Sequence, residues 1–156
     1  MLRKIYDRLF KIIEIICIVF VLAMIGVVTY MVVMRYIFNN SPRWGDEIAL
    51  FCMLWIGLLS AAIAMKENRH IRITLWEKVL STQKMKVLEV VVHIIVSIIL
   101  VFLMKYGYDM VKLSGGTVMT GSGIPLKYLY YAVPVSAFFI LIATIGRIGE
   151  IIGHKR

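Results

Sequence analysis

The stretch Arg35–Ile71, RYIFNNSPRWGDEIALFCMLWIGLLSAAIAMKENRHI, decides the fold class of this chain. A Pro-Trp turn and the acidic residues Asp46 and Glu47 open it, and a basic cluster with His70 closes it. Between them, Ile48–Met65 is an uncharged run of 18 residues, and a helix that crosses a bilayer needs about 17–25. The stretch therefore predicts a membrane-spanning helix with charges at both ends, and it contains no catalytic constellation.

Three other uncharged runs repeat this pattern. They are Ile15–Met34, Val90–Met104 and Tyr128–Gly146, with 20, 15 and 19 residues. The middle run is short, but a helix from Val87 spans a bilayer if the Glu89 carboxylate lies at the interface. Hydrophobic residues make up 61% of the chain, against about 45–50% in soluble proteins. We therefore expect an all-α integral membrane protein, a single domain of residues 1–156 with spans of about 12–37, 45–66, 87–110 and 126–150.

The basic residues predict how these spans are oriented. With a cytoplasmic N-terminus, 13 of the 18 Lys and Arg residues flank the cytoplasmic ends of the spans, as the positive-inside rule requires. Both termini are then cytoplasmic. The net charge of +9 has the same explanation, because the basic residues form no separate domain. We therefore expect no nucleic-acid partner.

The segment between the second and third spans predicts a short helix in the cytoplasmic interface. Apolar and charged residues alternate over about residues 71–81, a pattern typical of an amphipathic interfacial helix. The indole of Trp76 is expected at the level of the lipid headgroups, where its apolar body and polar tip are both accommodated. We expect His70, Arg72 and Trp76 to anchor this segment.

Few residues are candidates for chemistry. Cys17 and Cys52 lie inside predicted spans without a Cys-x-x-Cys motif, so we expect two small core residues. His93 is the only histidine inside a span. A haem would need facing axial histidines, and His70 and His154 lie at the wrong depth, so we expect an interhelical hydrogen bond for His93 instead. We expect no enzyme activity, no metal site and no cofactor in this chain.

The sharpest local hypothesis joins two charges at the outer membrane surface. Arg35 and Glu47 lie at the facing ends of successive spans, which a short turn connects. An ion pair between them, with Trp44 packed at headgroup level and Asp46 beside it, would hold the first helical hairpin together. The alternative is two solvated interfacial charges, whose interaction contributes about 0–1 kcal/mol.

Taken in order, these motifs resemble the small membrane subunit (DctQ-like) of TRAP (tripartite ATP-independent periplasmic) transporters. The residues that carry the resemblance are Arg35-Tyr36-x-Phe38, Pro42-x-Trp44-x-Asp46-Glu47, Trp55, Gly57, His70-Ile71, Gly123-Ile124-Pro125, Tyr131 and Pro134. Length, four spans and cytoplasmic termini agree, so the resemblance covers nearly the whole chain. Asp46 departs from the usual Glu, and Asn68-Arg69 precede the histidine where Gly is common.

The resemblance implies a division of labour in a bacterial inner membrane. A large membrane subunit would carry the substrate and sodium sites, and a periplasmic binding protein would deliver sialic acid, a dicarboxylate or another sugar acid. This chain would be a non-catalytic scaffold that packs against the large subunit and membrane lipid. We expect Arg43, Lys112 and Lys127 to face the binding protein.

Two other classes of protein remain as alternatives. A self-sufficient four-helix, proton-coupled exporter would need a carboxylate embedded in its first span. Glu14 is the candidate, and it lies about one turn inside the cytoplasmic end of that span. A membrane anchor for a redox enzyme would rest on His93 alone.

Overall fold

The computed structural model describes residues 2–67 and 82–153. Its helices are α1 (Leu2–Ile37), α2 (Arg43–Lys66), α4 (Thr82–Leu113), α5 (Lys127–Tyr130) and α6 (Ala132–Gly153). Four of the described segments are long and apolar enough to cross a membrane, α5 and α6 together forming the fourth. This confirms the all-α class with four spans. The interfacial helix expected over about 71–81, with His70, Arg72 and Trp76, lies outside the described residues.

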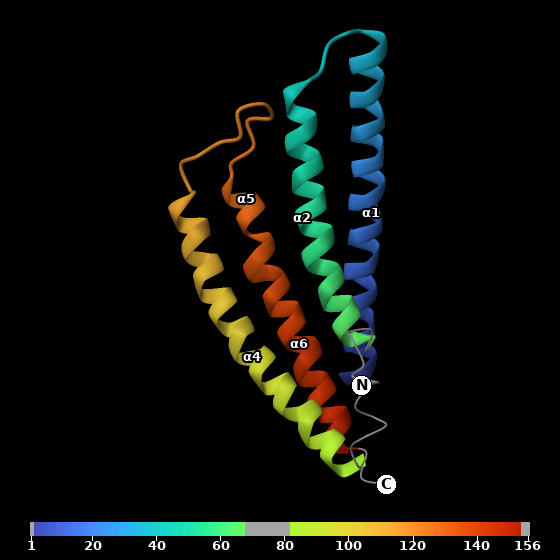
Figure 1. Ribbon diagram of the computed structural model, residues 1–156, viewed down its shortest axis with the longest axis vertical. Helices are drawn as coiled ribbons and strands as arrows, with labels where there is room; N and C mark the ends of the chain where they lie inside the picture. The colour runs from blue at the N-terminus through green and yellow to red at the C-terminus, as the bar shows by residue number, and fades with distance from the viewer. Residues whose placement is uncertain (1, 68–81, 154–156) are drawn as a thin grey trace.

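The four long helices lie side by side in one layer, in the order α1, α2, α6, α4 (Figure 1). Each helix packs only against its neighbours in this order, apart from side-chain contacts near the start of α1. The start of α1 and the end of α6 lie at the same end of the layer, which we call the terminal end. The connections over residues 38–42 and 114–126 lie at the other, which we call the loop end (Figure 1).

Small residues are among the buried residues of both central helices. On α2, Gly45, Cys52 and Leu59 are buried at intervals of seven residues, which places them on one face. On α6, five small residues are buried: Ala132, Ser136, Ala137, Ala143 and Thr144. Membrane helices gain little from the hydrophobic effect on association, so they depend on the close backbone approach that small side chains permit.

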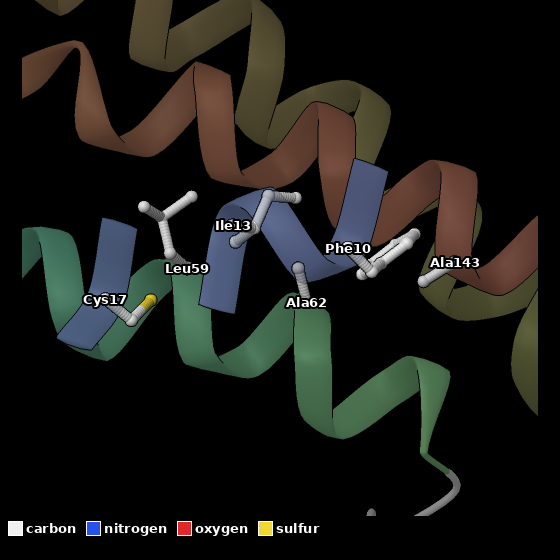
Figure 2. Close-up of a cluster of buried hydrophobic side chains, with 6 residues drawn as sticks. All are labelled: Phe10, Ile13, Cys17, Leu59, Ala62 and Ala143. Carbon is white, nitrogen blue, oxygen red and sulfur yellow. The ribbon is translucent and has the colours of Figure 1, made fainter. Parts of the chain in front are cut away.

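One hydrophobic cluster joins three helices at the terminal end of the layer. Phe10, Ile13 and Cys17 of α1 meet Leu59 and Ala62 of α2, and Phe10 extends to Ala143 of α6 (Figure 2). All six residues are buried. The cluster therefore confirms Cys17 as a small core residue, and Cys52 is buried as well.

The helix boundaries depart from the predicted spans in several places. α1 begins at Leu2, about ten residues before the expected start, and α4 continues to Leu113. Charged residues do not end a helix that has left the hydrocarbon, because its hydrogen bonds lie within its own backbone. The fourth span is interrupted at Tyr131, where Pro134 has no N–H to donate to the carbonyl four residues earlier.

The two outer helices are the longest. α1 has 36 residues and α4 has 32, so at 1.5 Å per residue they are about 54 and 48 Å long. The hydrocarbon core of a bilayer is about 30 Å thick. Both helices therefore extend well beyond it, and their ends lie among lipid headgroups or in water.

Candidate functional site

The most highly connected polar group at the loop end is the carboxylate of Glu47, on the second turn of α2. The backbone N–H of Gly121 donates to Oε1 at 2.8 Å, and the backbone N–H of Ser122 donates to Oε2 at 2.7 Å. The hydroxyls of Ser122 and Thr120 donate to the same carboxylate, at 2.7 and 3.3 Å. We call this set, Glu47 with Thr120, Gly121 and Ser122, the Glu47 clasp.

The conformation of the connection between α4 and α5 places these donors beside Glu47. Its two sides pair through hydrogen bonds from Met119 N to Ile124 O and from Leu126 N to Thr117 O, both 2.9 Å. Gly123 has a φ of +69°, a left-handed conformation that glycine adopts without steric cost. The chain therefore reverses direction between residues 119 and 124, and the tip of the turn presents its N–H groups to α2.

Close backbone contact holds the tip of this turn against the start of α2. A Cβ atom on Gly121 would lie 2.7 Å from the carbonyl carbon of Arg43 and 2.8 Å from the backbone nitrogen of Trp44. Both are backbone atoms, so they cannot move aside as a flexible side chain does. Only glycine fits there without displacing the turn, and with it the donors of the Glu47 clasp.

Another hydrogen bond joins α2 to α5, the short helix that follows this turn. The indole Nε1 of Trp55 donates to the backbone carbonyl of Tyr128 in α5, at 3.3 Å. The Trp55 ring also lies 6.1 Å from the ring of Phe20 in α1 and 6.0 Å from that of Phe51. Trp55 thus connects α2 to α1 on one side and to α5 on the other.

The comparison with known families now decides what kind of protein this is. The sequence model of one family, "Tripartite ATP-independent periplasmic transporters, DctQ component", matches residues 24–153. The chain belongs to the DctQ family. It is therefore a component of a transporter and not an enzyme, and it is an integral protein of the inner membrane. Such a component works with a large permease and a periplasmic binding protein.

Individual relatives agree with the family. The sialic acid TRAP transporter small permease protein SiaQ of Vibrio cholerae is 26% identical over 95% of this chain and 84% of the relative. A TRAP transporter small permease protein of Haemophilus influenzae is 24% identical over 95% of this chain and 92% of its own. The sialic acid TRAP transporter permease protein SiaT of Haemophilus influenzae is 19% identical over 77% of this chain, but over only 20% of its own length.

The ion pair predicted between Arg35 and Glu47 is wrong for this DctQ chain. Both residues are described, and no ion pair joins them. The Glu47 clasp explains why, since donors from the turn already occupy both carboxylate oxygens. Arg35 is exposed at the end of α1, and Asp46 is exposed beside the clasp.

Other contacts hold α1 and α2 together at the loop end. The rings of Tyr30 and Trp44 stack with their centroids 5.7 Å apart. Nearby, a Cβ on Gly45 would collide with the side chain of Met31, so α1 packs directly on the α2 backbone. Packing therefore holds the hairpin together. Trp44 contributes to it, as predicted, but no ion pair does.

The three cations predicted to face a binding protein all lie at the loop end. Arg43 and Lys112 are exposed and Lys127 is half-buried. The Lys112 ammonium lies 4.5 Å from the ring centroid of Tyr108, and the Lys127 ammonium lies 5.3 Å from that of Tyr128. Aromatic faces thus help to orient two of the three charges.

The hydrogen bond of His93 was predicted to run between helices, and this is wrong. Its Nδ1 atom pairs with the backbone carbonyl of Glu89 at 2.7 Å, one turn earlier in α4. The hydroxyl of Ser97 in turn donates to the carbonyl of His93 at 2.8 Å. Carbonyls of its own helix are close enough to satisfy a half-buried side chain without a partner helix.

A further polar group, at the terminal end, was missed by the sequence reasoning. The ammonium of Lys66, the last residue of α2, lies 2.9 Å from Oδ1 of Asp7 in α1. It also lies 5.3 Å from the ring centroid of Tyr6 and 5.2 Å from that of Phe10. The sequence signal was that Asp7 and Phe10 lie three residues apart, on neighbouring positions of one helix. That spacing does not show that Lys66 of α2 contacts both.

Proposed function

We propose that this DctQ chain is a non-catalytic scaffold that anchors and stabilises the large permease of a TRAP transporter. The observation that carries the proposal is the single-layer arrangement of its helices. A closed bundle covers its interior, whereas this layer leaves two broad apolar faces. Large hydrophobic side chains are exposed along α1 and α4, among them Leu22, Ile25, Ile98 and Phe102. Lipid and the helices of a larger membrane subunit are the partners that suit such faces.

The match to SiaT supports the same proposal. About one-fifth of that permease protein is similar to this chain, which suggests that a region of this kind is joined covalently to the permease there. The separate chain would make the same association through its surface. Its own described residues offer no group of three or more acidic, histidine or cysteine side chains for a metal ion. We propose that the large permease holds the sodium and substrate sites.

The substrate we propose is a small organic acid, with sialic acid as the first to test. The support is the name of the Vibrio cholerae relative, a sialic acid TRAP transporter small permease protein. Sodium coupling belongs to the same proposal. Uptake of labelled sialic acid into vesicles that contain all three components, with and without a sodium gradient, tests both points. Uptake of a dicarboxylate in its place would change the substrate class and leave the scaffold role intact.

Co-purification tests the scaffold role itself. A tagged copy of this chain, extracted from its native membranes in mild detergent, should bring down a large permease in a one-to-one ratio. Substitution of Leu22 and Ile98 by Asn would place amides on the proposed contact faces and should lower the recovery. Replacement of Tyr36 by Asn, beyond the hydrocarbon, is the control. Recovery of this chain only with itself would refute the proposal.

Docking of the binding protein is the second part of the proposal. Arg43, Lys112 and Lys127 place three positive charges at the loop end. Exposed charges at an interface mainly accelerate encounter, and salt screens them. Replacing all three by Gln should therefore slow transport at low salt, with a smaller effect at high salt. An equal effect at both salt concentrations would argue against electrostatic docking.

A further inference from the structure

The exposed side of α1 near its start carries a row of positive charges. Lys4, Arg8 and Lys11 are all exposed, and their spacing of four and three residues places them along one line of the helix. Phe10 and Ile13 lie on the opposite side of α1 and are buried in the cluster of Figure 2. Packing on α2 and α6 therefore turns these cations away from the layer. We call Lys4, Arg8 and Lys11 the cationic row.

The row lies where lipid headgroups are expected. The uncharged run Ile15–Met34 has 20 residues, about 30 Å of helix, which matches the hydrocarbon thickness. Lys11 lies four residues before this run, about 6 Å along the helix axis, and Lys4 lies about 10 Å beyond Lys11. The headgroup region of one leaflet is about 5–8 Å deep, so Lys11 reaches it directly and the long side chains of Arg8 and Lys4 extend toward it.

Apolar side chains border the row on one side. Ile5 and Ile12 are 62% and 55% exposed and follow Lys4 and Lys11 by one residue, so they lie on the adjacent face of α1. A lipid surface accepts both groups, because Ile12, about 4.5 Å before the uncharged run, reaches the acyl boundary while the cations meet phosphates.

Two acidic residues border the row, but they leave it with an excess of positive charge. Asp7 lies three residues after Lys4 and four before Lys11 and so borders the row, but its carboxylate already pairs with Lys66 of α2 at 2.9 Å. Glu14 lies one turn deeper than Lys11, at the hydrocarbon boundary. We propose that the cationic row binds the headgroups of anionic phospholipids, with Ile12 inserted beside them. This inference concerns the lipid contact of the chain and does not depend on what the transporter carries.

Native mass spectrometry of the delipidated full chain tests the proposal. The chain is offered equal amounts of dioleoyl phosphatidylglycerol and dioleoyl phosphatidylcholine, which share the same acyl chains and differ in charge. We expect bound phosphatidylglycerol to exceed phosphatidylcholine. Each cation near an anionic surface contributes about fivefold to binding, so Lys4→Gln/Arg8→Gln/Lys11→Gln should lower this preference by up to about a hundredfold.

Matched controls distinguish the row from general charge. Arg35→Gln/Arg43→Gln/Lys112→Gln removes three exposed cations from the loop end and should keep the preference. The single variant Arg8→Gln leaves two cations in place for membrane insertion, and we expect it to lower the preference about fivefold. An unchanged preference in both the triple and the Arg8 variant would overturn the proposal, as would an equal loss in the loop-end control.

A soluble competitor separates lipid from free phosphate. Glycerol phosphate in excess carries the same phosphoester charge without acyl chains, so it should displace little phosphatidylglycerol from the wild-type chain. Complete displacement would show a site for soluble phosphate and would overturn the assignment to lipid. Ile12→Ser tests the apolar border independently, and it should reduce phosphatidylglycerol binding while all three charges are kept.

Discussion

Glu47 and Gly121 are 74 residues apart in the sequence, yet the backbone N–H of Gly121 donates a 2.8 Å hydrogen bond to Oε1 of Glu47. This contact joins α2 to the turn between α4 and α5, and so connects the two halves of the layer at the loop end. Elsewhere those halves are joined by the packing of α2 on α6, by the Trp55–Tyr128 hydrogen bond and by the contact of Phe10 with Ala143. The Glu47 clasp therefore controls how the turn is placed relative to the first hairpin.

Glu47→Gln should loosen this junction. The amide keeps the shape of the side chain but replaces one acceptor oxygen by an NH2 group, which would face the N–H and hydroxyl donors of Ser122 or Gly121. We expect a lower melting temperature in detergent and faster proteolysis within residues 114–126. Asp46→Asn is the matched control, because Asp46 is exposed next to the clasp. If both variants melt like the wild type, the clasp is not structural.

Gly121→Ala tests the close backbone approach. The new Cβ would meet backbone atoms of Arg43 and Trp44, and overpacking of this kind costs about 1–3 kcal/mol. For a chain of this size, each kcal/mol lowers the melting temperature by about 2–4 °C. Gly116→Ala, in the same connection, is the control because a Cβ there meets nothing within 4 Å. Equal melting of the two variants would contradict the assigned contact.

Arg35 and Trp44 should differ sharply on substitution. Arg35 is exposed and unpaired with Glu47, so Arg35→Gln should change the free energy of unfolding by less than about 0.5 kcal/mol. Trp44→Ala removes the stack on Tyr30, and such pairs contribute about 0.5–1.5 kcal/mol beyond the area that they bury. Thermal melting of both variants, followed by size-exclusion chromatography, makes the comparison. A larger loss for Arg35→Gln would restore the ion pair as the element that holds the hairpin.

Lys66 should contribute more to stability than its partner Asp7. The Lys66 side chain is 24% exposed and lies near two aromatic rings, whereas the Asp7 side chain is 56% exposed. Lys66→Gln loses the ion pair and both cation–π contacts, each worth about 0.5–1 kcal/mol at an exposed site. Asp7→Asn loses only an ion pair, worth about 0–1 kcal/mol. Melting at low and high salt measures both, and an equal loss would mean that the rings contribute nothing.

The sequence was sufficient for the spans but not for the contacts between them. Uncharged runs such as Ile48–Met65 identify membrane helices because bilayer thickness sets their length. The partner of Glu47 follows from no local rule. Arg35 was the nearest opposite charge across a short turn, while the true donors are backbone N–H groups of a distant turn. The polar, glycine-containing run of residues 120–123 was the available signal, because successive N–H groups in a tight turn suit a carboxylate.

Ser136→Ala is expected to leave the protein unchanged or make it more stable. Ser136 is fully buried, and its hydroxyl has no hydrogen-bond partner within the described part of the chain. A buried polar group without a hydrogen-bond partner destabilises the folded state, and its removal breaks no hydrogen bond. Alanine also keeps the small volume that lets helices pack closely. Ser136→Leu is the steric contrast and should lower the melting temperature. A clear loss for Ser136→Ala would instead reveal a partner for this hydroxyl in the assembled transporter or its lipid.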